Sequence, residues 1–122
     1  MKGALIVDDD KQILNLVAAF LEYAGQFSFV DKANSGEEAL QIFEPGKYCI
    51  AVLDIIMSPM NGVDLAIKMR DLDKDLILIA ITGYSELRSE ANLAVAGFNE
   101  SFLKPFEYKD FMDYIKNFDC GG

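Results

Sequence analysis

The chain has 122 residues, a hydrophobic fraction of 52% and a formal net charge of −9. These values predict one globular domain with a substantial core, and they exclude a disordered tail. Nucleic-acid binding needs a basic face, so we expect no direct nucleic-acid partner. No apolar run approaches the ~18–20 residues needed to cross a bilayer, so we expect a cytoplasmic protein without membrane attachment. The acidity instead suits a divalent cation or a partner with a basic surface.

Histidine is absent, and the chain has two cysteines. The lack of histidine removes histidine-based triads and the common zinc sites from consideration. Cys49 lies within an apolar run, where we expect a small core residue, and Cys120 lies in the C-terminal tail, which we expect to be frayed. Their spacing matches no metal site, and we expect no disulfide scaffold.

The first expected element is a strand over residues 3–7, which is short and uniformly apolar. A helix follows from Lys11, with apolar residues on one face, Asp10 as its N-cap and Gly25 as its stop. A second strand is expected over residues 27–33.

The segment 35–38, Ser-Gly-Glu-Glu, is typical of a capping box, and it opens a second helix that ends before Pro45. The third strand, residues 49–53, is as apolar as the first, which indicates that both are central in the sheet. The third helix is expected from residue 63 to about residue 70.

A fourth strand is expected over residues 76–81, and a fourth helix from its cap at Ser85 to Ala96, followed by Gly97. Residues 102–103 form a short fifth strand. The last helix carries an apolar stripe at helical spacing, made of Tyr108, Phe111, Met112 and Ile115.

Alternation of five strands with five helices predicts an α/β fold with a parallel sheet covered by helices on both faces. In such sheets, ligands bind beyond the carboxyl ends of the strands, near the point where the strand order reverses. The residues at these ends are therefore the candidates for a site.

Polar residues stand at four of these strand ends. They are Asp8, Asp9 and Asp10 after the first strand, Asp54 after the third, Thr82 and Gly83 after the fourth, and Lys104 and Pro105 after the fifth. Carboxylates brought together repel one another, and a hard divalent ion such as Mg²⁺ relieves that repulsion. A lysine and a threonine suit an incoming phosphoryl group, and an aspartate can accept that group as an acyl phosphate. Each residue has an ordinary structural explanation alone, such as a helix cap for Asp10, but together they favour one site.

Four segments resemble the receiver domains of two-component response regulators, the CheY-like superfamily. They are Val7-Asp8-Asp9-Asp10, the stretch from Leu53 to Gly62 with the sequence LDIIMSPMNG, Thr82-Gly83, and Lys104-Pro105-Phe106. The resemblance covers essentially the whole chain, and the joint spacing of the segments is specific. It implies a flavodoxin-like (βα)₅ three-layer sandwich of strand order 2-1-3-4-5, with residues 1–122 as one receiver domain.

The resemblance also implies a role for each site residue. Asp54 is the phosphoacceptor. Asp9 and Asp54 bind Mg²⁺ (or Mn²⁺) directly, together with the backbone carbonyl of Ile56, and Asp8 acts through water. Thr82 bonds a phosphoryl oxygen, Lys104 pairs first with the carboxylate and then with the phosphoryl group, and Pro105 is a cis proline. The implied donor is a sensor histidine kinase or a histidine phosphotransfer protein, so the protein is a signalling domain that catalyses its own phosphorylation and dephosphorylation, not a conventional enzyme.

The sequence departs from the family pattern at three places. Ser58 stands where the family usually has proline, with Pro59 one place later. Ser101 stands where the family often has a switching aromatic residue, so we expect activation to rely on movement of the 82–87 loop. Ile56 and Tyr84 flank the path of attacking water without a polar group, which predicts a long-lived phosphoryl-aspartate.

Two other functions fit a similar topology less well. A phosphohydrolase of the haloacid-dehalogenase type needs a second aspartate two residues after the nucleophile, where Asp54 has Ile56. A flavodoxin-like electron carrier needs a phosphate loop after the first strand, where three aspartates would repel the flavin phosphate. Within the receiver family, the sequence leaves open a stand-alone protein or part of a larger regulator or hybrid kinase, and a monomer or homodimer. The output is a downstream protein partner or an output domain that the sequence lacks.

Overall fold

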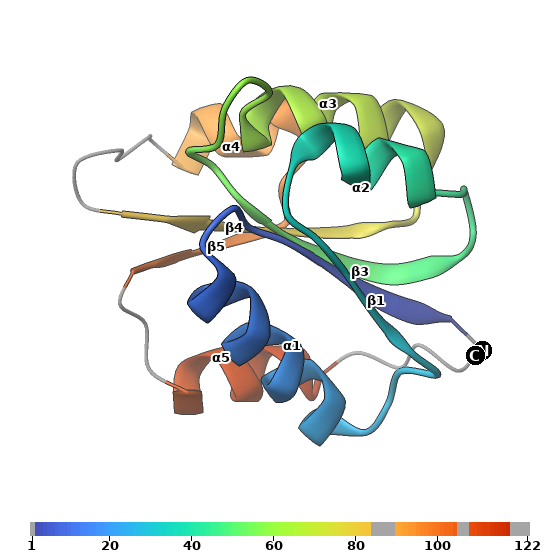
Figure 1. Ribbon diagram of the computed structural model, residues 1–122, viewed down its shortest axis with the longest axis vertical. Coiled ribbons are helices and arrows are strands. Elements are labelled where there is room, and N and C mark those ends of the chain that lie inside the picture. The colour runs from blue at the N-terminus through green and yellow to red at the C-terminus, as the bar shows by residue number, and fades with distance from the viewer. Residues whose placement is uncertain (1, 84–89, 105–107, 118–122) are drawn as a thin grey trace.

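The computed structural model describes residues 2–83, 90–104 and 108–117, with the side chains of 90–92 left aside. The helices and strands alternate along the chain (Figure 1). In order they are β1 (Gly3–Val7), α1 (Lys11–Ala24), β2 (Val30–Ala33), α2 (Gly36–Ile42), β3 (Tyr48–Asp54), α3 (Gly62–Leu72), β4 (Ile77–Thr82), α4 (Glu90–Ala96), β5 (Glu100–Leu103) and α5 (Tyr108–Ile115). No helix within these residues is long and apolar enough to cross a membrane.

The five strands form one parallel sheet of order β2-β1-β3-β4-β5, which confirms the expected flavodoxin-like topology. All five residues of β1 are buried, and β3 and β4 are buried except for one half-buried residue each. The edge strands β2 and β5 are partly exposed. The expectation that the first and third strands lie inside the sheet is therefore confirmed, because helices cover both of their faces.

The helices form two layers, with α2, α3 and α4 on one face of the sheet and α1 and α5 on the other (Figure 1). Alternate strand residues feed two separate cores, as the two-residue period of a strand requires. In β3, Leu53 packs on the α2–α4 side and Val52 on the α1–α5 side. Side-chain packing against helices on both faces therefore holds the ends of the central strands in place.

The helix ends follow their sequence signals. The Asp10 side chain accepts hydrogen bonds from the backbone N–H groups of Gln12 and Ile13, and Gly25 ends α1 in the left-handed region with φ of 80°. The Ser35 hydroxyl accepts from the Glu38 N–H at 3.1 Å, while the Glu38 carboxylate accepts from the Asn34 N–H, one residue before the cap. The expected capping box therefore forms, with its reciprocal bond shifted by one position.

Three expectations need correction. The fifth strand begins at Glu100 and not at residue 102, because Glu100 and Ser101 also pair with β4. The second strand begins at Val30 and not at residue 27, because the ring of Phe29 turns in to pack beside Tyr48, with ring centroids 5.8 Å apart. Cys49 is half-buried and disulfide-bonded, which corrects the expectation of a small core residue in a chain without a disulfide scaffold. It stands in β3 where the register with β1 slips between Gly3 and Ala4, and such a bulge lets a side chain leave the core pattern. Cys120 lies outside the described residues, as do the expected helix cap Ser85 and the residue Tyr84.

Candidate functional site

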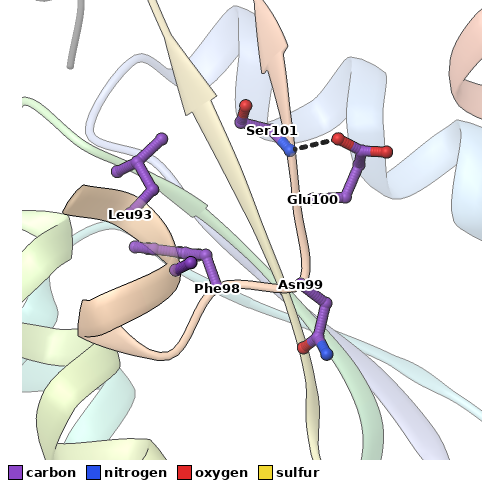
Figure 2. A pocket seen from close by; sticks show the side chains of 6 residues that line it. Leu93, Phe98, Asn99, Glu100 and Ser101 are labelled. Atoms are coloured by element: carbon purple, nitrogen blue, oxygen red, sulfur yellow. Dashed lines mark hydrogen bonds between the residues drawn. The ribbon is translucent and has the colours of Figure 1, made fainter. Parts of the chain in front are cut away.

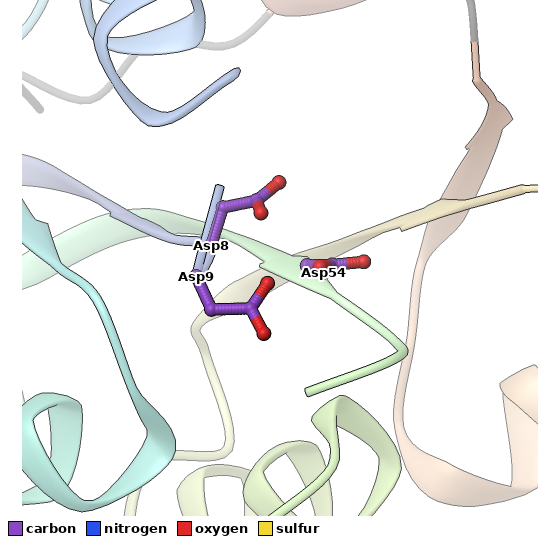
Figure 3. A group of neighbouring side chains, drawn as sticks. All are labelled: Asp8, Asp9 and Asp54. Atoms are coloured by element: carbon purple, nitrogen blue, oxygen red, sulfur yellow. The ribbon is translucent and has the colours of Figure 1, made fainter. Parts of the chain in front are cut away.

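Three carboxylates meet at the carboxyl ends of β1 and β3. Each of Asp8, Asp9 and Asp54 offers an oxygen atom, and these atoms all lie within 4.8 Å of one another. Figure 3 shows the three side chains pointing in a common direction, beyond the ends of their strands. Asp8 and Asp54 are buried, with 0% and 4% of their surface exposed, whereas Asp9 is exposed. The cluster is therefore buried at Asp8 and Asp54 and open to solvent at Asp9.

Strand register explains why these residues meet. Val7 of β1 pairs with Leu53 of β3. The residues that follow them, Asp8 and Asp54, therefore lie next to each other at the ends of neighbouring strands. The Asp10 N–H donates to Asp8 Oδ1 at 2.9 Å, which orients the Asp8 carboxylate at the start of α1. After Asp54, the Ile55 N–H donates to the Ile81 carbonyl at 3.0 Å and keeps the chain on the sheet.

Lys104 is the cation of the site. Its Nζ lies 3.3 Å from Asp8 Oδ2 and 3.3 Å from Asp54 Oδ1. Its backbone N–H donates to the Thr82 carbonyl at 2.6 Å, which ties the end of β5 to the end of β4. The Lys104 ammonium group thus forms ion pairs with two buried carboxylates at the same distance.

The electrostatics of the site are unbalanced. Burial and the negative charge of Asp8 raise the pKa of Asp54 to about 7, although Lys104 acts in the opposite direction. Burial lowers the pKa of Lys104, but the charges of Asp8 and Asp54 outweigh burial and raise it. Asp8 Oδ2 is buried and accepts no hydrogen bond within the described chain, so the ion pair with Lys104 is its partner. A site that leaves a carboxylate oxygen in this state suits a further cation.

Thr82 lies at the end of β4, beside the carboxylates. It is 4% exposed and follows Ile81, which pairs with Asp54 in the sheet. Its hydroxyl donates a long hydrogen bond of 3.4 Å to the Gly83 carbonyl. The structure therefore places Thr82 on the strand next to Asp54, as the sequence predicted.

The loop after Asp54 alternates between buried and exposed side chains. Ile55 and Met57 are buried, at 0% and 6% exposed, while Ile56 between them is 47% exposed. The Ile56 N–H donates to Asp54 Oδ1 at 3.3 Å. A cis peptide bond joins Ser58 to Pro59, which the sequence gave no reason to expect. The cis proline that the resemblance implied, Pro105, lies outside the described residues.

Sequence reasoning missed the steric role of Gly62. This residue begins α3 directly against Asp54: a Cβ atom added to it would lie 2.1 Å from the Asp54 carbonyl oxygen. The Gly62 N–H also donates to the Ile55 carbonyl at 2.8 Å. A glycine eight residues after the aspartate was the available signal, but the spacing alone does not reveal which atoms come close.

The residues at the expected switch position face opposite sides of β5. Ser101 lines a small pocket between α4 and β5 with Leu93 and Phe98, and its N–H donates to the Glu100 carboxylate at 2.9 Å (Figure 2). Phe102 points the other way and packs on Phe111 of α5, with ring centroids 5.5 Å apart. The aromatic neighbour therefore lies on the far side of the sheet from α4.

Comparison with known proteins identifies the family. The model of the family described as "Response regulator receiver domain" matches residues 4–116. The chain belongs to this family. The HssR proteins, described as heme response regulators, are 38% identical in Staphylococcus haemolyticus and 34% identical in a strain of Staphylococcus aureus, each over 116 residues. These alignments cover 95% of this chain and 50% of each relative, so the chain spans about half the length of the curated relatives it matches.

Solved receiver structures resemble the chain over nearly its whole length. A CheY-like receiver from Methanospirillum hungatei is 32% identical with a TM-score of 0.84, covering 96% of this chain and 92% of that one. The response regulator TrrA of Thermotoga maritima, solved in complex with Mg(2+)-BeF, is 34% identical with a TM-score of 0.81, covering 96% of this chain and 98% of that one. The chain is thus a CheY-like receiver domain of a two-component system, in agreement with the resemblance found in the sequence.

Proposed function

We propose that this receiver accepts a phosphoryl group on Asp54 from the phosphohistidine of a kinase or phosphotransfer protein, in a cytoplasmic two-component phosphorelay. The observation that carries the proposal is the placement of Asp54 beside a second buried carboxylate, Asp8, with the ammonium of Lys104 at 3.3 Å from both. In the transfer, an Asp54 carboxylate oxygen attacks phosphorus, the bond from phosphorus to the histidine nitrogen breaks, and the imidazole leaves with the electron pair of that bond. Membership of the receiver family supports this reaction.

The donor set fits a divalent cation. Hard cations such as Mg²⁺ prefer carboxylate and carbonyl oxygens, and three carboxylates reach one place here. We expect Asp9 and Asp54 to bind Mg²⁺ (or Mn²⁺) directly with the Ile56 carbonyl, and Asp8 to act through water. When bound, the ion neutralises charge that develops on the phosphoryl oxygens. TrrA, the relative solved with Mg(2+)-BeF, supports the same expectation for this chain.

Lys104 and Thr82 complete the proposed acceptor site. Lys104 already contacts the Asp54 carboxylate, and its ammonium would follow the charge to the phosphoryl oxygens after transfer. The Thr82 hydroxyl would donate to a phosphoryl oxygen and draw its loop inward. In hydrolysis, water would attack phosphorus, the bond from phosphorus to the Asp54 oxygen would break, and Asp54 would return to a carboxylate as inorganic phosphate leaves. The domain would thus catalyse its own phosphorylation and dephosphorylation without being a conventional enzyme.

The remaining expectations stay predictions. They are the extent of the receiver unit over residues 1–122, a downstream protein partner or a further output domain, and a choice between monomer and homodimer.

Mass spectrometry of the protein with acetyl phosphate and Mg²⁺ tests the proposal. We expect a mass increase of one phosphoryl group that depends on the metal, and Asp54→Asn should abolish it. Asp75→Asn is a matched control, because Asp75 lies in the α3–β4 turn, where its N–H donates to Asp73. Metal-independent labelling, or equal labelling of Asp54→Asn, would contradict the proposal. Turnover of a generic phosphatase substrate would instead support the phosphohydrolase alternative.

A further inference from the structure

Met60 lies six residues after the acceptor, in the loop that the proposed metal site needs. The loop runs from Ile56 to the α3 cap Asn61, and Ile56 supplies the proposed carbonyl ligand. Within the described chain, the N–H groups of residues 56–60 make one hydrogen bond, from Ile56 to Asp54 Oδ1 at 3.3 Å. The loop backbone is therefore not held by a hydrogen-bond ladder, and side-chain packing must hold it.

Two methionine side chains supply that packing. Met57 is 6% exposed and belongs to the core between the sheet and the α2–α4 layer. Met60 is half-buried and packs against the same core, but it also reaches a different element, helix α2. Unbranched methionine side chains fill irregular gaps of this kind well.

The contact between Met60 and α2 is close. A Cβ atom added to Gly36, the first residue of α2, would lie 2.9 Å from Met60 Sδ and 3.1 Å from both Met60 Cβ and Met60 Cγ. The Met60 side chain therefore lies against the bare backbone of Gly36 through its Cβ, Cγ and Sδ atoms. This contact joins the middle of the loop to a helix whose own start is capped by Ser35.

We propose that Met60 is a positioning residue, which braces the 56–61 loop against α2 and so holds the Ile56 carbonyl ready for a divalent cation. This inference rests on the proposed metal site. Without the brace, the loop samples more conformations, and cation binding must then order it. The cost falls on cation affinity and not on the chemistry of Asp54.

A second apolar residue provides the matched control. Ile67 on α3 lines the same surface groove as Met60, Pro59 and Glu37, but it belongs to a helix and not to the loop. It is 51% exposed. Truncation of either residue opens the groove, whereas only truncation of Met60 releases the loop.

The test is an NMR titration of backbone amides with MgCl₂, together with heteronuclear relaxation of residues 56–60 without metal. We expect Met60→Ala to raise the Mg²⁺ dissociation constant about tenfold, which corresponds to about 1.4 kcal/mol. The same variant should lower the order of residues 56–60 in the metal-free protein. Ile67→Ala should stay within about twofold of wild type, as surface substitutions usually do. Met60→Leu, of similar volume, should restore affinity to within about twofold.

Gly36→Ala tests the brace from its other side. The added methyl group pushes Met60 without shortening it, and we expect a rise of about two- to fivefold in the dissociation constant. This variant also keeps the inference testable if Met60→Ala fails to fold.

The outcomes separate the two proposals. Absence of Mg²⁺-dependent shifts at Asp8, Asp9 and Asp54 in the wild-type protein would overturn the metal site and the brace with it. Wild-type binding with unchanged affinity in Met60→Ala would overturn the brace alone. Equal weakening by Ile67→Ala would also overturn the brace, because it would show a general effect of the groove.

Discussion

Substitution of Gly62 by alanine should damage the acceptor site with no change to any of its charged groups. The added Cβ would lie 2.1 Å from the Asp54 carbonyl oxygen and 2.9 Å from the Asp54 carbonyl carbon. Ordinary contacts between carbon and a carbonyl oxygen begin near 3.3 Å, so the two groups must separate by roughly 1 Å. Both contact atoms belong to the backbone, which cannot rotate away as a flexible side chain does.

The sheet decides which group moves. Asp54 pairs with Ile81 in β4, and the next N–H, that of Ile55, donates to the Ile81 carbonyl. If β3 holds, the start of α3 moves and the loop from Ile56 to Asn61 moves with it. If β3 yields, Asp54 moves relative to Asp8 and Lys104. Either displacement changes the geometry of the acceptor site.

We expect Gly62→Ala to lower the rate of phosphorylation by acetyl phosphate about 10²-fold, the typical effect of a displacement of about 1 Å in a reacting geometry. Overpacking of this kind also lowers the free energy of unfolding by about 1–3 kcal/mol. Phosphorylation is measured by mass spectrometry at saturating Mg²⁺, and stability by urea denaturation.

Two controls separate geometry from stability. Ile115 of α5 is fully buried in the α1–α5 layer. Ile115→Val should cost about 0.5–1.5 kcal/mol, and truncation to alanine about 2–5 kcal/mol, which brackets the loss expected for Gly62→Ala. Both controls should retain near wild-type phosphorylation while folded. Wild-type rates in Gly62→Ala, or equal slowing in a control of matched stability, would refute the reasoning.

Three further predictions concern other parts of the chain. In metal-free buffer, a folded-state pKa of about 7 for Asp54, above its ordinary value of 3.8, means that the folded state binds the extra proton. The free energy of unfolding should therefore fall as pH rises from about 4 through about 7. Urea denaturation at a series of pH values measures this dependence. An equal dependence on pH in Asp54→Asn would contradict the prediction. Because Cys49 is disulfide-bonded, reduction or Cys49→Ser should lower the free energy of unfolding by about 2–4 kcal/mol, the usual contribution of a disulfide. Identical urea midpoints with and without reductant would refute this. Ile56→Asn should shorten the lifetime of phosphorylated Asp54, measured by decay of the phosphoryl mass shift, and slower decay than wild type would refute the expectation of a long-lived wild-type phosphoryl group.

The alternation of strands and helices and the position of polar residues at the strand ends could be predicted because their signals are local and mutually consistent. The strand order came from the resemblance to receiver domains. Apolar runs alternate with capped amphipathic helices, and Asp10 and Gly25 end α1 where the sequence placed them. Parallel strands then bring their carboxyl ends to one edge, so Asp8 and Asp54 meet without any knowledge of side-chain geometry. The prediction was strongest where topology alone decides proximity.

Features that depend on contacts between distant residues could not be predicted. The start of β2 depends on the ring of Phe29, whose edge packs against Gly3 from another strand. Cys49 is disulfide-bonded and lies at a bulge in the pairing of β1 with β3, which no local pattern reports. The importance of Gly62 depends on a single carbonyl oxygen eight residues earlier. Each of these features can be found only in the three-dimensional structure, because the contacting residue is distant along the chain or lies at a separation that has no sequence signature.

Among the described residues, the resting site holds more carboxylates than cationic groups. Three carboxylates meet one ammonium group, and Lys104 lies equally far from Asp8 and Asp54. Burial first, and then the negative charge of Asp8, raise the pKa of Asp54 to about 7, so without a metal ion this carboxylate binds a proton more readily than an exposed one does. A divalent cation would remove the need for that proton and leave Asp54 ionised as a nucleophile. Transfer of a phosphoryl group would then place further negative charge at the same point, where the cation and Lys104 can act on it together. Burial of Asp8 therefore works against the stability of the resting site but favours a site that binds a cation before it accepts phosphate.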